Sequence, residues 1–268
     1  MTKVCVFGLG RIGLPLSLVC ADSGYDVVGI DINRELVEKL ERGVAPFNEP
    51  GLEELLKEHI HRDFHPKKSL NGEIQKDLKE ADYIIVCVGT EFVKHPARPR
   101  LSTLYSIIGT LIASGLRGDG EAKTIILRVT LPIGTTDEVK DFIEKKTGLK
   151  EGEDFLLAFV PERVIEGEAV REERSLPKII GCYSDDGFQR VKKFFERVGG
   201  QLVRVSDPKT AEFVKLIDNS WRNTRFAFSN EASYLADVKG IDVIEALGAA
   251  NEGYKRNQIP IPGPVSGY

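Results

Sequence analysis

The sequence predicts an α/β protein with a doubly wound parallel sheet, a long connecting helix and a small all-helical segment. Three observations predict it. Apolar runs of strand length alternate with amphipathic helical stretches up to residue 205. A glycine-rich turn joins the first run to a helix. From residue 207 the alternation stops, and no helix breaker occurs before Gly240. We therefore expect a sheet domain over 1–206 and a helical segment over 207–268.

Composition narrows the class of protein. The chain has 268 residues and a net charge of −4, so a nucleic-acid footprint is not expected. No apolar run is long enough to span a bilayer, and a strand begins too early to leave room for a signal peptide. The four cysteines are scattered in apolar surroundings and read as free thiols. We expect a cytoplasmic protein.

The first strand, turn and helix carry a dinucleotide-binding pattern. An apolar run, residues 4–7, precedes three glycines in G-x-G-x-x-G spacing: Gly8, Gly10 and Gly13. These permit a tight turn, close approach of the backbone to a pyrophosphate, and close packing of helix on strand. Arg11 and Ile12 complete the turn at the helix N-terminus, which favours phosphate. The pattern predicts a Rossmann-type site, although a βαβ unit without a ligand shares it.

The acid after the second strand indicates which dinucleotide binds. Asp31 follows the apolar run 27–30 and can accept hydrogen bonds from a ribose, which favours NAD over NADP. Arg34 lies nearby and weakens that preference, because an arginine accommodates a 2′-phosphate. We take both residues as candidate NAD contacts.

The remaining elements of the sheet domain follow in order. Helices are expected at 34–42, 52–60, 74–81, 103–116, 135–147 and 185–198, strands at 83–88, 123–129, 155–160, 178–182 and 201–205, and loops at 61–72 and 92–100. His59, His61 and His65 lie close in sequence, but no Cys or carboxylate set completes a ligand spacing, so no metal site is predicted.

Polar residues follow several strands. Val88, Gly89 and Thr90 end one of them, and ligands of open sheets lie beyond such ends, so these are candidate cofactor contacts. Glu162 and Glu166 follow the strand at 155–160; their position fits a site and a solvated loop equally.

One helix of unusual length is predicted over 208–239. Asp207 suits its N-cap and Pro208 its first position. Lys215 and Asn219 share one face, with Arg222 a turn further on. An ammonium beside an amide can stabilise an oxyanion, and an ordinary surface pair is the alternative. The helix also carries an apolar stripe, which predicts cover by a partner subunit.

Together these motifs resemble the UDP-sugar dehydrogenase family, and the branch acting on UDP-N-acetylmannosamine more closely than the UDP-glucose branch. The matching stretches are GLGRIGLPLS (8–17), GIDIN (29–33), NEPGLEELL (48–56), VTLPIGTTDEV (129–139), PERVIEG (161–167), AEFVKLIDNSWRNTRFAFSNEASYLAD (211–237), GIDVIEALGAANE (240–252) and PGPVSGY (262–268).

The resemblance implies an NAD-dependent oxidation of the sugar C6 alcohol to the acid in two hydride transfers, through a cysteine thioester. By motif, Thr130 positions water and contributes to the NAD site, and Glu162 assists proton transfer. Lys215 and Asn219 stabilise the alkoxide and thiohemiacetal oxygens. Glu166 lines the NAD site with Thr90 and the glycines.

The resemblance also implies a substrate site and a homodimer. The expected substrate contacts are Glu162, Arg163, Lys215, Asn219, Arg222, Arg256, Gly263 and Gly267, with Arg256 in relatives coming from the partner subunit. The helix over 207–239 corresponds to the family's dimer core.

The chain departs from the family pattern in two places. Val88-Gly89-Thr90-Glu91 stands where relatives read V-P-T-P, which loosens that turn. The family's nucleophilic Cys follows the loop 262–268 directly, and the sequence stops at Tyr268. The UDP-binding domain is absent as well. We expect a truncated form that folds and binds NAD but does not make the sugar acid.

Two other functions fit part of the pattern. A single-step β-hydroxyacid dehydrogenase also joins a Rossmann domain to a long helix bearing K-x-x-x-N and needs no Cys, but has no use for the EPGL, PER and PGPVSGY segments. A non-catalytic NAD-binding module is the other, and the retained Thr130, Glu162, Lys215 and Asn219 speak against it.

Overall fold

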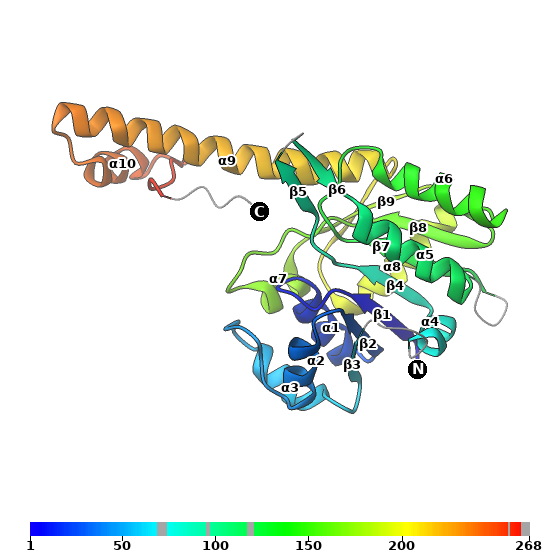
Figure 1. Cartoon of the computed structure of the whole chain (residues 1–268). Helices are drawn as coiled ribbons and strands as arrows, with labels where there is room; N and C mark the ends of the chain where they lie inside the picture. The colour runs from blue at the N-terminus through cyan, green and yellow to red at the C-terminus, as the bar shows by residue number, and fades with distance from the viewer. Residues whose placement is uncertain (69–73, 95–96, 117–120, 257, 264–268) are drawn as a thin grey trace. The chain divides into compact units, whose positions relative to one another are not determined.

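The structure is a computed structural model that describes residues 1–68, 74–94, 97–116, 121–256 and 258–263 (Figure 1). By contacts the chain divides into two units, residues 1–213 and 214–268. The division falls inside the long helix α9 (Pro208–Lys239), whereas the sequence pattern changes at 206 and 207. None of the described helices is both long enough and apolar enough to cross a membrane.

Unit 1 is built on an eight-stranded sheet in the order β10-β9-β8-β7-β4-β1-β2-β3. The strands are β1 Lys3–Phe7, β2 Asp26–Asp31, β3 Phe64–Lys68, β4 Tyr83–Val86, β7 Lys123–Leu127, β8 Phe155–Phe159, β9 Lys178–Cys182 and β10 Leu202–Val205. Six are mutually parallel from β8 to β3. The order reverses beside β1, so the fold is the predicted doubly wound one and β1 and β4 meet at its switch point.

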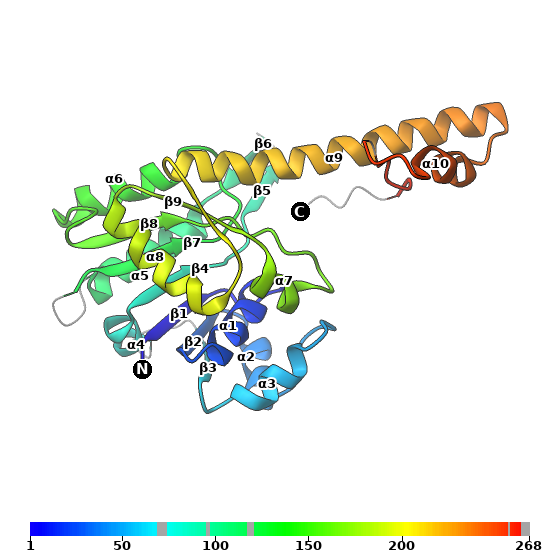
Figure 2. The same cartoon turned by 180° about the vertical axis from the view of Figure 1, so that it is seen from behind.

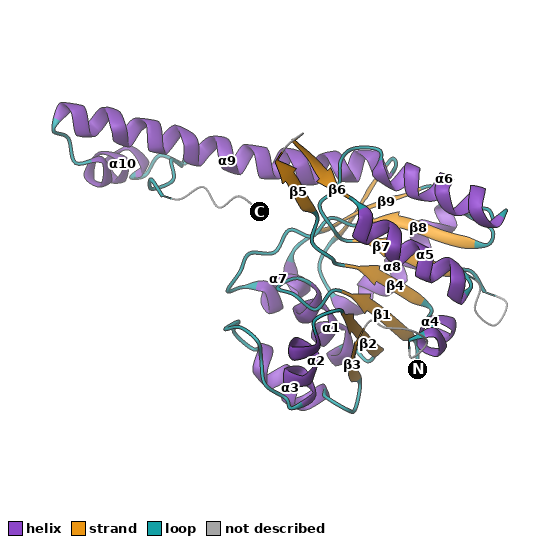
Figure 3. Ribbon diagram, in the orientation of Figure 1, coloured by secondary structure: helices purple, strands orange, loops and turns teal. Residues whose placement is uncertain are grey.

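Helices cover both faces of this sheet (Figures 1, 2 and 3). They are α1 Gly13–Asp22, α2 Arg34–Glu41, α3 Leu52–His59, α4 Gln75–Glu80, α5 Ser102–Ser114, α6 Thr135–Thr147, α7 Ala169–Ser175 and α8 Asp185–Val198. In the two views α5 and α6 lie on one face, and α1 and α8 on the other. The apolar core runs through α1 and α8, where Phe194 stacks on Tyr25 and Tyr83 with ring centroids 4.9 Å apart in each pair. Both faces are therefore buried, as the continuous apolar strands require.

Several expectations about the sheet were wrong. The stretch 61–72 was expected to be loop, but β3 lies within it: Phe64 is fully buried and pairs with Val27. The residues that follow Phe64 in this strand are His, Pro and Lys, which are tolerated in an edge strand. They interrupt the apolar pattern by which a strand is predicted. The loop expected at 92–100 contains a hairpin, β5 Glu91–Lys94 and β6 Ala97–Arg100.

Strand direction was also mispredicted at one side of the sheet. β9 runs antiparallel to β8, with Phe159 opposite Gly181, and β10 runs parallel to β9. A continuous apolar run does not encode direction, because a strand buried on both faces looks the same either way. The short helix α7 before β9 was not predicted either.

Glu212, at the start of α9, ties this helix to the sheet domain within unit 1. Its buried carboxylate accepts hydrogen bonds from the backbone N–H of Gly134 and from the N–H and hydroxyl of Thr136, at 2.5, 2.8 and 2.6 Å. These groups begin α6, so Glu212 caps that helix from a distant part of the chain.

Unit 2 consists of the rest of α9, the helix α10 (Val243–Asn251) and the segment that follows it. Asp242 caps α10 by accepting from the N–H of Ile244 at 2.8 Å. Asn230 on α9 holds Gly263 through two hydrogen bonds of 3.0 Å, one to its carbonyl oxygen and one from its N–H. Ser229 donates to the carbonyl of Pro260 at 2.6 Å. The segment 258–263 therefore lies along α9.

Candidate functional site: the glycine turn

The predicted glycine turn joins β1 to α1 at the switch point of the sheet. Gly8 has φ +91°, a value that L residues rarely adopt, and its N–H donates to the carbonyl of Ile30 at 2.8 Å. At Gly13 a Cβ would lie 1.8 Å from the carbonyl oxygen of Gly8. Helix and strand therefore approach as closely as the sequence predicted.

Gly10 differs from Gly8 and Gly13, because the space beside it is open. It is exposed, and a Cβ there would meet no atom within 4 Å. The conformation does not require glycine at this position, so the open space above it is available for a ligand. A pyrophosphate approaching the N–H groups at the start of α1 would use that space. The turn thus fits the cofactor that its pattern predicts.

Asp31 braces the turn from the end of β2. One carboxylate oxygen accepts from the N–H of Leu9 at 2.7 Å and the other from the N–H of Asn33 at 2.8 Å. A carboxylate has further lone pairs, so these bonds leave room to accept from ribose hydroxyls. Arg34 forms a 2.6 Å ion pair with Glu38 on its own helix.

Two further strand ends meet beside the turn. Thr90 donates its hydroxyl to the carbonyl oxygen of Thr130 at 2.7 Å, which joins the ends of β4 and β7. The intervening Gly89 is exposed with open space around it, and the side chain of Val88 is partly buried. The structure therefore brings the candidate cofactor residues Thr90 and Thr130 together.

The loop after β8 carries the two predicted acids. Glu162 accepts a hydrogen bond from the N–H of Val164, within the loop. Glu166 forms an ion pair with Arg11 of the glycine turn, Nε to Oε1 3.2 Å, so this acid lies at the turn. Arg163, which follows Glu162 in the same loop, is partly buried.

A buried charge cluster supports this loop and was not predicted. Glu173 on α7 is fully buried and bonds Arg128, at the end of β7, at 2.8 Å and Lys178, on β9, at 3.2 Å. Burial lowers the pKa of Lys178. Removing one partner of such a cluster leaves an uncompensated buried charge, so the three residues lock α7 to the sheet. The sequence feature that could have predicted this cluster is the presence of Arg128 and Lys178 in two largely apolar predicted strands.

The remaining candidate residues belong to unit 2. Lys215, Asn219 and Arg222 lie on α9, where Arg222 donates to the amide oxygen of Asn219 at 3.3 Å. The guanidinium of Arg256 lies 5.0 Å from the ring centroid of Tyr254. Gly263 is held by Asn230, and Gly267 lies outside the described residues.

The three neighbouring histidines have separate partners. The buried His59 ring contacts Asp63 and Asp22 at 3.1 and 3.2 Å. His61 contacts the carbonyl of Glu41 at 2.9 Å, and His65 contacts Asp26 at 3.3 Å. One group of potential metal ligands occurs among the described residues, Asp22, Glu58 and His59, but Asp22 is also paired with Arg174 at 2.6 Å.

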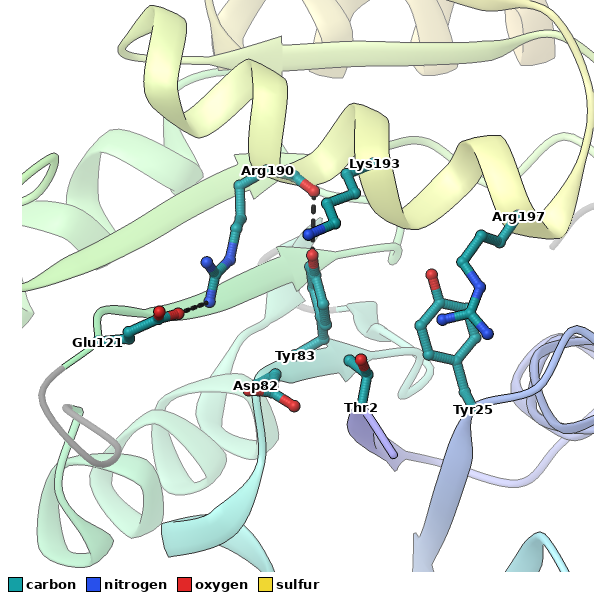
Figure 4. Close-up of a pocket in the computed structure, with 8 residues that line it drawn as sticks. All are labelled: Thr2, Tyr25, Asp82, Tyr83, Glu121, Arg190, Lys193 and Arg197. Carbon is teal, nitrogen blue, oxygen red and sulfur yellow. Dashed lines mark hydrogen bonds and ion pairs between the residues drawn. The ribbon is translucent and has the colours of Figure 1, made fainter.

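A small pocket of about 180 Å³ lies near the amino-terminal ends of β1, β2, β4 and β7 (Figure 4). Its charges are largely paired within the fold: Arg190 bonds Glu121 at 2.8 Å, and Arg197 donates to the carbonyl oxygens of Ser23 and Gly24 at 3.0 Å. The Arg197 guanidinium also stacks 4.2 Å from the ring centroid of Tyr25. Each arginine therefore has a partner within the protein.

Comparison with known proteins identifies relatives along the whole chain. Residues 2–199 match the family model described as the NAD-binding domain of the UDP-glucose/GDP-mannose dehydrogenase family, and residues 209–268 match that family's central domain. The UDP-N-acetyl-D-mannosamine dehydrogenase of Pyrococcus horikoshii is 36% identical over 97% of this chain and 60% of its own length.

Solved structures agree with the sequence comparison. The structure of the UDP-D-ManNAc dehydrogenase from Pyrococcus horikoshii superimposes with a TM-score of 0.88 at 35% identity, over 98% of this chain and 60% of that one. The UDP-N-acetyl-mannosamine dehydrogenase Cap5O from Staphylococcus aureus gives 0.83 at 30% identity, over 98% and 61%. The chain thus spans about 60% of the length of these relatives.

Proposed function

This chain belongs to the UDP-glucose/GDP-mannose dehydrogenase family, and from this premise we propose that it serves the NAD-dependent oxidation of a UDP-hexose at C6 to the uronic acid. The observation that carries the proposal is the glycine turn of the NAD-binding domain, open above Gly10 and braced by Asp31. UDP-N-acetylmannosamine is the proposed substrate, because relatives that share a third of the sequence bear that name. Membership of this family speaks against a single-step β-hydroxyacid dehydrogenase.

NAD, when bound, supplies the hydride acceptor for both oxidations. The chain's own residues bind and orient it: the glycine turn takes the pyrophosphate, and Asp31 takes the adenosine ribose. Thr90 and Thr130 form the adjoining wall, since their hydrogen bond fixes two strand ends together. The Asp31 carboxylate also repels a 2′-phosphate, which supports NAD rather than NADP.

The proposed acid–base and electrostatic groups are assigned by their positions in the family's motifs. Glu162 moves a proton at the reacting carbon's oxygen and assists attack of water held by Thr130. Lys215 and Asn219 stabilise the negative charge that develops on that oxygen, as an ammonium and an amide donor do in an oxyanion site. Arg163, Arg222, Arg256, Gly263 and Gly267 are proposed to contact the UDP-sugar.

None of the four cysteines within residues 1–268 suits the role of the nucleophile. Burial raises the pKa of Cys5, Cys87 and Cys182 to about 12, and it raises the pKa of Cys20 further. A thiol with such a pKa is protonated at neutral pH, and the thiolate is the form that attacks an aldehyde. We therefore propose that residues 1–268 by themselves do not form the uronate.

The first prediction tests the proposed function directly. The 268-residue chain should bind NAD⁺ at least about tenfold more tightly than NADP⁺, because the 2′-phosphate meets the Asp31 carboxylate. Isothermal titration calorimetry measures both affinities. Incubation with NAD⁺ and UDP-N-acetylmannosamine, followed by mass spectrometry, should show no uronate. Equal affinity for the two dinucleotides would contradict the assignment of NAD as the cofactor. Catalytic uronate formation would contradict the inference that residues 1–268 lack the nucleophile.

We also propose a homodimer formed through the helix at 207–239. Trp221, Phe228 and Leu235 are each more than 60% exposed and recur at intervals of seven residues, so they share one face of α9. Large exposed side chains in one stripe are typical of an interaction surface.

The second prediction concerns this stripe. Trp221→Glu and Phe228→Glu should each weaken the dimer about 100-fold or more, because a charge replaces a buried aromatic anchor. Size-exclusion chromatography with light scattering, over a range of protein concentrations, follows the change in mass. Asn223→Glu, on another face of the same turn of helix, should leave the mass unchanged. A wild-type chain that is monomeric at high concentration would refute the proposal.

A further inference from the structure

Arg11, in the glycine turn, contacts two other loops. Its Nε pairs with Glu166 of the loop after β8 at 3.2 Å. Its guanidinium lies 5.2 Å from the ring centroid of Phe47, in the loop before α3. Both members of the ion pair are roughly half exposed, and exposed pairs contribute little on their own. The loop that carries Glu166 also has a buried restraint.

Glu49 supplies that restraint. Its two carboxylate oxygens accept hydrogen bonds from the N–H groups of Ala169 and Gly167, at 2.7 and 2.8 Å. The residue is only 7% exposed, and its own carbonyl oxygen accepts from the N–H of Leu52, at the start of α3. Glu49 therefore joins the loop before α3 to a loop 118 residues further along the chain.

Glu172 also restrains this loop, since its carboxylate accepts from the N–H of Ile165 at 2.8 Å, but Glu49 is the acid that bonds Gly167 and Ala169. Residues 165–168 are exposed, and Gly167 has φ +87° with open space around it. The N-cap residue of α7, Glu168, makes no capping bond with its own side chain. Glu49 thus acts as the missing cap, and a carboxylate at a helix N-terminus forms charge-assisted bonds stronger than neutral ones.

We propose that Glu49 is a positioning residue of the nucleotide site, which holds Glu166 against the glycine turn through Gly167 and Ala169. The inference rests on the proposed NAD-dependent function and adds to it a residue outside the glycine motif and the catalytic set. It follows that the loop before α3 is part of the cofactor site, because it carries both Glu49 and Phe47.

The test compares Glu49→Gln with the wild-type 268-residue chain. The amide keeps the size of the side chain but has one acceptor oxygen, so one of the two N–H groups loses its partner. We expect the affinity for NAD⁺, measured by calorimetry at 25 °C on folded protein, to fall about tenfold, the effect of one charge-assisted hydrogen bond. Glu49→Asp keeps both carboxylate oxygens on a side chain that is one methylene shorter. Its affinity for NAD⁺ should also fall, but by less than that of Glu49→Gln.

A double-mutant cycle separates positioning from a purely structural role. If Glu49 acts through the loop of Glu166, then Glu49→Gln combined with Glu166→Gln should lose less NAD⁺ affinity than the product of the two single losses. The matched control is Glu151→Gln, which removes a carboxylate that accepts from the N–H of Leu157 at 3.2 Å in another loop. That variant should lower only the melting temperature.

The outcomes are distinct. Failure of the wild-type chain to bind NAD⁺ would refute the proposed function itself. If the wild-type chain binds NAD⁺ and Glu49→Gln binds it equally tightly, the proposed role of Glu49 is wrong. The role is also wrong if the loss of NAD⁺ affinity in the double variant equals the product of the losses in Glu49→Gln and Glu166→Gln. Should Glu49→Gln fail to fold, unchanged affinity in Glu49→Asp would overturn it equally.

Discussion

Gly13→Ala is expected to destabilise the chain by about 4 kcal/mol or more, the range reached when packed elements are forced apart. The added Cβ would lie 1.8 Å from the carbonyl oxygen of Gly8 and 3.2 Å from the Cβ of Cys87. Both neighbours are held by backbone hydrogen bonds across the sheet, Gly8 to Ile30 and Cys87 to Phe7, each at 2.8 Å. Thermal unfolding followed by circular dichroism should show a melting temperature lower by roughly 10 °C or more.

The control for this variant is a glycine with the same substitution and free surroundings. Gly109 lies inside α5, and a Cβ there meets nothing within 4 Å. Gly109→Ala should raise stability by about 0.5–1 kcal/mol, because alanine loses less backbone entropy in a helix. A Gly13→Ala protein as stable as the wild type would show that α1 does not approach the turn this closely.

Gly10→Ala is expected to abolish NAD binding while leaving the fold intact. The methyl group has no protein neighbour within 4 Å, so unfolding should be unchanged. It would fill the space through which the backbone approaches a pyrophosphate. We expect the affinity for NAD⁺ to fall about 100-fold or more, a loss of at least about 2.7 kcal/mol.

Calorimetry measures this loss, and thermal unfolding without nucleotide verifies the fold. Gly109→Ala again serves as the control and should bind NAD⁺ like the wild type. Retention of wild-type affinity by Gly10→Ala would mean that the pyrophosphate does not lie over the turn, and the assignment of the cofactor site would fail. A loss of stability in Gly13→Ala and a loss of NAD⁺ affinity alone in Gly10→Ala would show that Gly13 serves packing and Gly10 serves binding.

Local signals predicted the elements that dominate the fold. The long helix begins at Pro208 and ends at Lys239, as expected from the cap at Asp207 and the breaker at Gly240. Asp207 accepts from the N–H of Thr210 at 2.8 Å, and Gly240 has φ +67°. The glycine turn and Asp31 were equally readable, because each of their roles requires one residue type at one spacing.

The parts that escaped prediction depend on contacts between distant residues. Glu49 bonds residues 118 and 120 positions away, and the polar residues around it give no sign that its carboxylate is buried. Glu173 likewise finds Arg128, 45 residues earlier, only through the sheet. The sequence around such an acid predicts that it is exposed, because its burial depends on the tertiary fold.

The two outermost strands, β3 and β10, bear on how the protein avoids self-association through its sheet. An edge strand presents free N–H and C=O groups that can recruit another chain and start aggregation. Pro66 in β3 lacks an N–H, and the strand ends in Lys67 and Lys68, whose charges would have to be buried by an incoming strand. Arg204 gives β10 a charge of its own, paired with Asp185 at 2.5 Å. The polar residues that made β3 look like a loop therefore disfavour the addition of a strand from another chain.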